Sequence, residues 1–241
     1  MAIRIPKKIF GEEVSDATVK NVLKGLRTSD DPASPVVQPP RSNVSSLDGF
    51  IYVPSADLHF AKERTHYGTN WEQAHLALAQ EGSFMPTPAQ TWELLKYLKG
   101  NLADPECRKV YDEILKKKDP WKGEWQNAKY LKISGKMSMR EVEVRNGKVE
   151  HKSAQNLDAC LMEDCWADFD SANKQGLLTR KSSDNTYKQG NNIYFWYPRE
   201  GAVARFGAVS DGAGLGCDGG PSDSNDGLGV RAVRRATARK K

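Results

Sequence analysis

The segment FGAVSDGAGLGC, residues 206–217, decides the fold, because its side chains follow the two-residue period of a β-strand. Phe206, Ala208 and Ser210 alternate with Gly207, Val209 and Asp211, and after one extra residue at Gly212 the residues Ala213, Leu215 and Cys217 alternate with Gly214, Gly216 and Asp218. This period predicts a strand with one bulge. Its small apolar face would lie on a core, and its other face would be exposed.

The exposed face has an unusual composition. Thirteen positions, on this face and in the loop that follows, are occupied only by Gly, Asp, Val and Asn: Gly207, Val209, Asp211, Gly212, Gly214, Gly216, Asp218, Gly219, Gly220, Asp223, Asn225, Asp226 and Gly227. Glycine is a poor strand residue, and a strand seldom carries so many on one face. All four residue types arise from an AAC asparagine codon when only its adenines change. Lys, Glu, Gln, Met and Trp do not arise in this way, and none of them occurs in residues 207–227.

Restoring asparagine gives the frame Phe-Asn-Ala-Asn-Ser-Asn-Asn-Ala-Asn-Leu-Asn-Cys, which Pro221-Ser222, Ser224 and the run LGVRAV at 228–233 follow. The frame resembles the variable region of the target proteins of diversity-generating retroelements, most closely the archaeal variable proteins. The stretch GSFMPT at 82–87, which leads to Trp92-Glu93, is similar to the helix entry of the same family. The likeness covers residues 50–234.

The resemblance implies a C-type lectin fold, of the branch shared with formylglycine-generating enzymes. In such systems an error-prone reverse transcriptase mutagenises adenines copied from a template repeat. Residues 204–233 would be the variable region, and its Gly, Asp, Val and Asn positions the hypervariable ligand-binding surface. Scaffold positions would be Phe206, Ala208, Leu215, Leu228 and Val230. The ligand would be a protein or a cell-surface molecule, and display on a cell or a virus particle is compatible with the sequence.

The predicted surface positions of this chain include many glycines and four aspartates but no aromatic residue. Residues that dominate binding energy are usually Trp, Tyr or Arg. The sequence therefore predicts a hollow, locally acidic surface. The alternative interpretation, a flexible Gly/Ser/Asp linker over residues 201–229, is opposed by the alternating apolar residues, because linkers lack an apolar face.

Helices are predicted in the first half of the chain. Ser15 begins a capped amphipathic helix, and a connection rich in Pro and Ser follows it up to residue 46. Thr69 with Glu72 and Thr87 with Gln90 form capping boxes. The second of these helices would end at Gly100, and a third would begin at Asp104-Pro105.

Strands are predicted in the second half. Phe50 to Val53 is a short early strand, Asn146-Gly147 is the turn of a hairpin, and Ile193 to Tyr197 is an aromatic strand. Helices followed by strands indicate an α+β fold. We expect an N-terminal helical arm in residues 1–46, a lectin-like domain in 47–234 and a basic tail in 235–241. The arm would pack on another part of the protein or pair with a second subunit in an oligomer.

Other motifs do not indicate chemistry. Gly214 to Gly219 matches G-x-G-x-x-G, but Pro221 follows at once and no βαβ unit surrounds it. His59, His66 and His75 lack a ligand spacing, and the tripeptides of calcium-dependent sugar-binding lectins are absent. Cys160 and Cys165 lack an activating His or Lys, and Cys217 falls on the core side of its strand. We therefore expect no enzyme activity, no cofactor and no metal.

The net charge of +5 is concentrated at the end of the chain, in Arg231, Arg234, Arg235, Arg239, Lys240 and Lys241. The ordinary interpretation is a solvated terminus. The alternative function is a basic nucleic-acid-associated protein that acts through this tail, but the tail has no aromatic residues for base stacking. No window has the run of about 20 apolar residues that a membrane span needs, and we expect no signal peptide.

Overall fold

The computed structural model describes residues 8–9, 12–13 and 47–236. The chain divides into two units, Met1–Asn43 and Val44–Lys241. In the first unit, β1 (Lys8–Ile9) pairs antiparallel with β2 (Glu12–Glu13). The helix expected from Ser15 and the connection that follows it lie outside the described residues.

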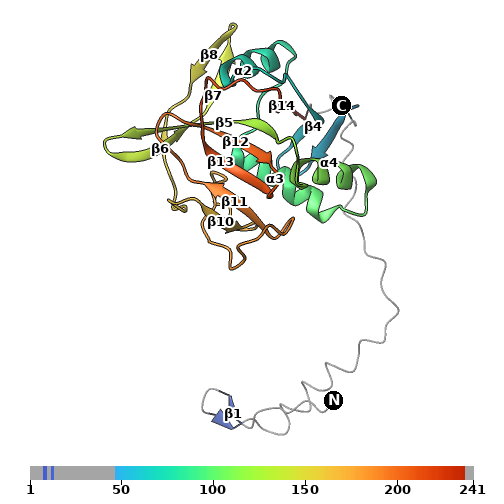
Figure 1. Ribbon diagram of the computed structural model, residues 1–241, viewed down its shortest axis with the longest axis vertical. Helices are drawn as coiled ribbons and strands as arrows, with labels where there is room; N and C mark the ends of the chain where they lie inside the picture. Colours follow the sequence, from blue (N-terminus) through green and yellow to red (C-terminus); the bar gives the residue numbers. More distant parts are fainter. Residues whose placement is uncertain (1–7, 10–11, 14–46, 237–241) are drawn as a thin grey trace. The chain divides into compact units, whose positions relative to one another are not determined.

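The second unit is a mixed α+β structure, as predicted (Figure 1). Its helices are α2 (Trp71–Gln80), α3 (Pro88–Gly100) and α4 (Pro105–Leu115). Its strands are β3 (Phe50–Val53), β4 (Leu58–Thr65), β5 (Lys122–Ile133), β6 (Lys136–Arg140), β7 (Val142–Arg145), β8 (Lys148–His151), β9 (Gln155–Asn156), β10 (Cys165–Asp168), β11 (Asn192–Trp196), β12 (Val203–Ala208), β13 (Ala213–Gly219) and β14 (Leu228–Arg235). Among the described helices, none is long and apolar enough to cross a membrane.

One large sheet organises this unit, in the strand order β10-β11-β13-β12-β5-β14-β4-β3. The pairs β11–β13 and β5–β14 are parallel, and the other neighbours on this path are antiparallel. Strands β12 and β13 therefore lie inside the sheet, with neighbours on both sides. The segment is not a flexible linker.

Residues 206–217 form a hairpin and not the single bulged strand that the sequence predicts. Ala208 ends β12 and faces Ala213 at the start of β13, and the Val209 N–H donates to the Gly212 carbonyl at 2.8 Å to close the turn. The prediction was wrong because the extra residue at Gly212 belongs to a turn. The alternation survives because directly opposed residues of an antiparallel pair point to the same face of the sheet.

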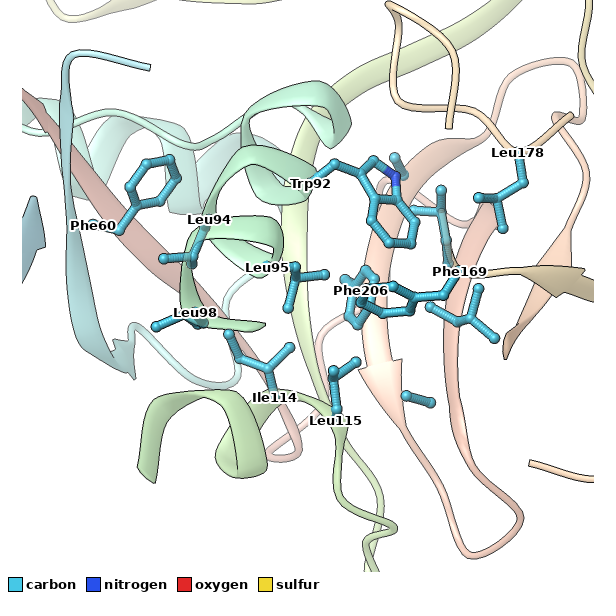
Figure 2. Close-up of a cluster of buried hydrophobic side chains, with 14 of the residues drawn as sticks. Phe60, Trp92, Leu94, Leu95, Leu98, Ile114, Leu115, Phe169, Leu178 and Phe206 are labelled. Atoms are coloured by element: carbon cyan, nitrogen blue, oxygen red, sulfur yellow. The ribbon is translucent and has the colours of Figure 1, made fainter. Parts of the chain in front are cut away.

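The inner face of this hairpin lies on the hydrophobic core. Phe206, Ala208, Leu215 and Cys217 are each no more than 1% exposed, as predicted. Helix α3 covers them: the ring of Trp92 lies 6.1 Å from that of Phe206, edge to face (Figure 2). The scaffold positions Leu228 and Val230 are also buried, in a second cluster with Trp71 and Trp125. Apolar burial of this kind is the main favourable term in folding.

The helix starts follow the sequence with one shift. Thr87 and Gln90 form the predicted capping box of α3, and Asp104 caps α4. For α2, the cap is Asn70 with Gln73, one residue later than the predicted pair. The Thr69 hydroxyl instead donates to the carbonyl of His66.

Other turn predictions are confirmed in part. Asn146 and Gly147, with φ of 51° and 71°, form the turn between β7 and β8. Both residues have the left-handed backbone conformation that a type I′ turn requires. Gly100 is the last residue of α3, where the sequence predicted the end of the helix, and Asn101 is its C-cap.

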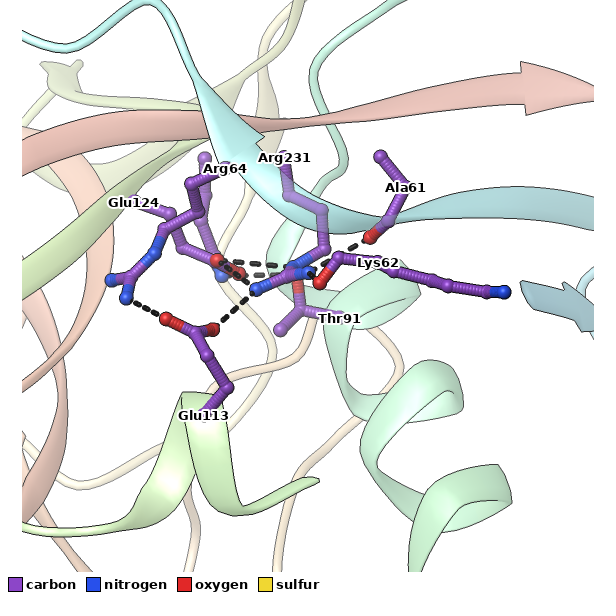
Figure 3. A network of polar contacts seen from close by, with 8 residues as sticks. Ala61, Lys62, Arg64, Thr91, Glu113, Glu124 and Arg231 are labelled. Carbon is purple, nitrogen blue, oxygen red and sulfur yellow. Dashed lines mark hydrogen bonds and ion pairs between the residues drawn. The ribbon is translucent and has the colours of Figure 1, made fainter. Parts of the chain in front are cut away.

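A buried ion-pair network joins β14 to its neighbours (Figure 3). The side chain of Arg231 is 0% exposed and lies 3.0 Å from a carboxylate oxygen of Glu124 on β5 and 3.1 Å from one of Glu113 on α4. Its Nη1 donates to the carbonyls of Ala61 and Lys62 on β4, at 2.8 Å each. Arg64 pairs with the other oxygen of Glu113. Arg231 is therefore not part of a solvated basic tail.

The next two basic residues are also engaged. The Arg234 guanidinium donates to Ser83 and lies 4.9 Å from the centre of the Phe50 ring. Arg235 ends β14 and lies over Phe84. Arg235, the first residue of the expected tail 235–241, therefore belongs to the sheet. Arg239, Lys240 and Lys241 lie outside the described residues.

Replacing Arg231 with Met should lower the free energy of unfolding by about 3–5 kcal/mol, because Glu124 would stay buried without its cation. Urea unfolding followed by circular dichroism measures this. The double variant Arg231→Met/Glu124→Met should recover much of the loss, since no unpaired charge remains buried. A single variant as stable as the parent protein would contradict the role of the network.

Candidate ligand-binding face

Three glycines form a row across the outer face of the sheet. Gly207 on β12 is directly opposite Gly214 on β13 and Gly123 on β5. Directly opposed residues point to one side of a sheet. Since none of the three has a Cβ, no side chain of the row itself projects from the side of the sheet away from Phe206.

Aromatic side chains from outside the segment flank this row. A Cβ built on Gly214 would lie 2.2 Å from the Trp196 ring, and one built on Gly123 would lie 2.8 Å from the Trp121 ring. A Cβ on Gly212 would meet Tyr187 at 2.6 Å. The indoles and the phenol ring therefore occupy space that side chains on these glycines would otherwise fill.

Between them lies a pocket of about 170 Å³, which we call the glycine pocket. It is lined by Trp121, Trp196, Arg205, Gly207, Val209, Gly212 and Gly214. Four of these residues belong to the set predicted from the codon pattern. The hollow surface expected from the glycine content is therefore present in the structure.

Trp196 is the last member of an aromatic series on the outer face of β10 and β11. Its ring centre lies 4.7 Å from that of Tyr194, which lies 5.2 Å from that of Trp166. Ile193 and Phe195, the alternate residues of β11, are buried in the core with 0% exposure. The two-residue period of a strand thus separates core residues from this outer series.

Arg205 is the cation of the face. Its guanidinium lies 3.8 Å from carboxylate oxygens of both Asp218 and Asp223, and its aliphatic stem passes over Gly216 and Gly219. Arg199 lies 3.9 Å from Asp218 as well. The predicted acidic character is therefore offset at two of the four aspartates, while Asp211 and Asp226 are exposed.

The predicted binding residues differ in exposure. Asp211, Asp223, Asn225 and Asp226 are exposed, and Gly207, Val209, Asp218 and Gly220 are half-buried. Gly212, Gly214, Gly216, Gly219 and Gly227 are buried, because Tyr187, Trp196, Arg205, Trp121 or a neighbouring strand covers them. Except for the turn residue Asp211 and for Asp226, which lies near Gly68, the set gathers around Arg205, Trp121, Trp196 and Tyr187.

The sequence did not predict four further residues that line the face. Trp121, Tyr187 and Trp196 come from other segments, and Arg205 lies on β12 but outside the Gly/Asp/Val/Asn set. One signal was available, because Tyr194 and Trp196 alternate with the apolar Ile193 and Phe195. Trp121 and Tyr187 come from loops, where no period marks the direction of a side chain.

The motif Gly214 to Gly219 lies wholly within β13. It does not form the strand-to-helix turn that cradles a dinucleotide. Among residues 8–9, 12–13 and 47–236, no group of three or more His, Cys, Asp or Glu side chains is placed to hold a metal ion.

The cysteines are poorly placed for nucleophilic chemistry. Burial raises the pKa of the Cys217 thiol, which is 0% exposed and accepts a hydrogen bond from Tyr130 at 3.1 Å. Burial also raises the pKa of Cys160 to about 11, and the pKa of Cys165 is raised by burial and by Glu163. Thiolates are the reactive form, so these shifts oppose reactivity at neutral pH.

Comparison of the chain with models of protein families, with curated proteins and with solved structures finds no match.

Iodoacetamide at pH 8 should leave Cys217 of the native protein unmodified, because its thiol is buried and its pKa is raised. Cys165, which is half-buried, should react more slowly than a free cysteine. Mass spectrometry of tryptic peptides over time measures both, with the urea-unfolded chain as the control. Rapid alkylation of Cys217 in the native protein would contradict the burial and reopen a catalytic interpretation.

Proposed function

We propose that the protein is a non-enzymatic ligand-binding protein whose binding face is diversified by adenine-directed mutagenesis through a retroelement. The face consists of the outer side of β12 and β13 and the loop that leads to β14. A C-type lectin fold of the formylglycine-generating-enzyme branch is part of this proposal. Its ligand would be a protein or a cell-surface molecule.

The observation that carries the proposal is the backbone conformation of the glycines. Glycines with positive φ occur at Gly49, Gly68, Gly82, Gly135, Gly147, Gly176, Gly190 and Gly201. The backbone favours glycine at each of those positions, because other residues seldom adopt positive φ. The glycines within residues 207–227 have no positive φ. Their backbone conformation does not require glycine, which agrees with residues that arise by mutation of another codon.

The surroundings of these glycines support the same view in part. A Cβ at Gly216 or Gly220 would first meet a carboxylate oxygen of Asp218 or Asp223, at the flexible end of a side chain. At Gly212 and Gly214 it would meet the packed rings of Tyr187 and Trp196, at 2.6 and 2.2 Å, and at Gly207, Gly219 and Gly227 a backbone carbonyl oxygen, at 3.0, 3.0 and 2.7 Å. Larger residues are therefore accommodated most easily at Gly216 and Gly220.

The fixed residues of the segment support a scaffold role. Phe206, Ala208, Leu215 and Cys217 face the core, and β12 and β14 pair with opposite edges of β5. The segment is held by strand pairing at both of its ends. Its outer face can therefore change composition while the inner face keeps the packing of the core.

Replacing Gly220 with Asn should change the free energy of unfolding by less than about 1 kcal/mol, because the added Cβ displaces only the exposed Asp223 side chain. Gly176→Asn is the matched control. Gly176 has a φ of +82°, and a Cβ there would lie 2.3 Å from the backbone nitrogen of Ala89. We expect a loss of about 2 kcal/mol or more for this control. Equal losses in urea unfolding would argue against tolerance in the segment.

Sequencing the neighbourhood of the gene tests the diversification itself. We expect a near-copy of the DNA that encodes residues 204–233, with asparagine codons at the Gly, Asp and Val positions and mismatches only at adenines. A reverse transcriptase gene should lie beside it. A neighbourhood with neither feature would overturn this part of the proposal.

A further inference from the structure

The glycine pocket has the size of a single ring. Its volume is about 170 Å³. A dry cavity of about 150 Å³ with apolar walls accepts one benzene molecule. The pocket therefore suits one ring-sized group and is too small for a whole folded element.

Its lining favours a flat ring over a polyhydroxylated one. Trp121, Trp196 and Val209 supply apolar surface, and Gly207 and Gly214 contribute no side chains. Aromatic rings pack well against indoles in stacked or edge-to-face arrangements. A sugar ring carries several hydroxyl protons that need acceptors, and none of the side chains that line the pocket is a carboxylate, an amide or a hydroxyl.

Arg205 is the one charged residue among those that line the pocket. Its guanidinium carries N–H donors in a planar fork. The carboxylates of Asp218 and Asp223 lie 3.8 Å from it, beyond hydrogen-bond distance, so they counter its charge without using its donors. Among the described residues, Asp218 and Asp223 are the charged groups with which Arg205 forms ion pairs. The Arg205 side chain is 34% exposed.

We propose that the glycine pocket binds a tyrosine side chain of a protein partner, with the phenol oxygen accepting a hydrogen bond from Arg205. The ring would lie over the half-buried Gly207, between the two indoles. This inference rests on the proposed function in so far as the face binds a ligand, but it does not depend on how the segment was diversified. Trp121, Trp196 and Arg205 lie outside the diversified set, so the pocket is partly built from fixed residues.

The test is saturation-transfer NMR on the full chain with small probes. N-acetyl-L-tyrosinamide should receive saturation most strongly at its ring protons, and N-acetyl-L-phenylalaninamide should bind about three- to tenfold more weakly, because it lacks the acceptor. N-acetyl-L-leucinamide and methyl glucoside should show little transfer. Stronger transfer to methyl glucoside than to the tyrosine probe would overturn the proposal.

Three variants locate the binding. Val209→Trp fills the pocket from the turn and should abolish transfer to the tyrosine probe, whereas Ser210→Ala, at an exposed position of the same turn that does not line the pocket, should leave it unchanged. Arg205→Gln should weaken tyrosine binding and remove most of its preference over phenylalanine. Thermal unfolding of each variant verifies that it is folded.

Tyrosine binding that survives Val209→Trp, or a preference for tyrosine that survives Arg205→Gln, would overturn the assignment. Such a failure is distinguishable from failure of the proposed function, because the template repeat and the tolerance of Gly220→Asn are measured without any probe. A folded protein with the template repeat but without tyrosine binding would remove only the inference about the ring.

Discussion

The buried guanidinium of Arg231 is the constraint on which the arrangement of this unit depends. The pairing of β4 with β14 shifts its register between Arg231 and Val233. At that irregularity the carbonyls of Ala61 and Lys62 point to the Arg231 Nη1, which donates to both. Burial by itself would lower the pKa of this guanidinium, but Glu124 and Glu113 reverse the effect and raise it. One side chain thus connects β14, β4, β5 and α4.

The position of β14 in turn determines where the proposed binding face lies. Because β14 pairs with one edge of β5 and β12 with the other, the chain between β13 and β14 has to cross from one side of β5 to the other. This crossing loop carries Asp223, Asn225 and Asp226, which are exposed. Core packing and the buried ion pairs hold both ends of the loop, so its exposed residues contribute little to stability.

In a strand inside a sheet, the residues on the two faces have different surroundings and therefore different packing requirements. On the inner face, Phe206 and Leu215 pack in a core of high density, where a change of even one methylene affects stability. On the outer face, the indoles of Trp196 and Trp121, which come from another strand and from a loop, pack over two glycines of the row. The chemistry of this face therefore belongs as much to its fixed neighbours as to the segment itself.

The sequence determined the local features of the protein. The alternation in residues 206–217 identified the buried residues Phe206, Ala208, Leu215 and Cys217, because the direction of a side chain in a strand depends only on its parity. The start of α3 at Thr87 also followed from local hydrogen bonds. The codon pattern marked thirteen positions, and whether they bind a ligand stays a prediction. The cap of α2 was displaced by one residue, because Asn70 and Thr69 are both good caps and only the structure selects between them.

Tertiary structure decided the rest. Parity cannot distinguish a bulge from a turn, so only the pairing of Ala208 with Ala213 showed a hairpin. Arg231 lies among basic residues near the end of the sequence, yet it is buried because two distant carboxylates converge on it. Trp121, Trp196 and Arg205 meet at the glycine pocket because β5, β11, β12 and β13 are neighbours in the sheet. Such convergence depends on strand order, a long-range property that no local pattern of residues encodes.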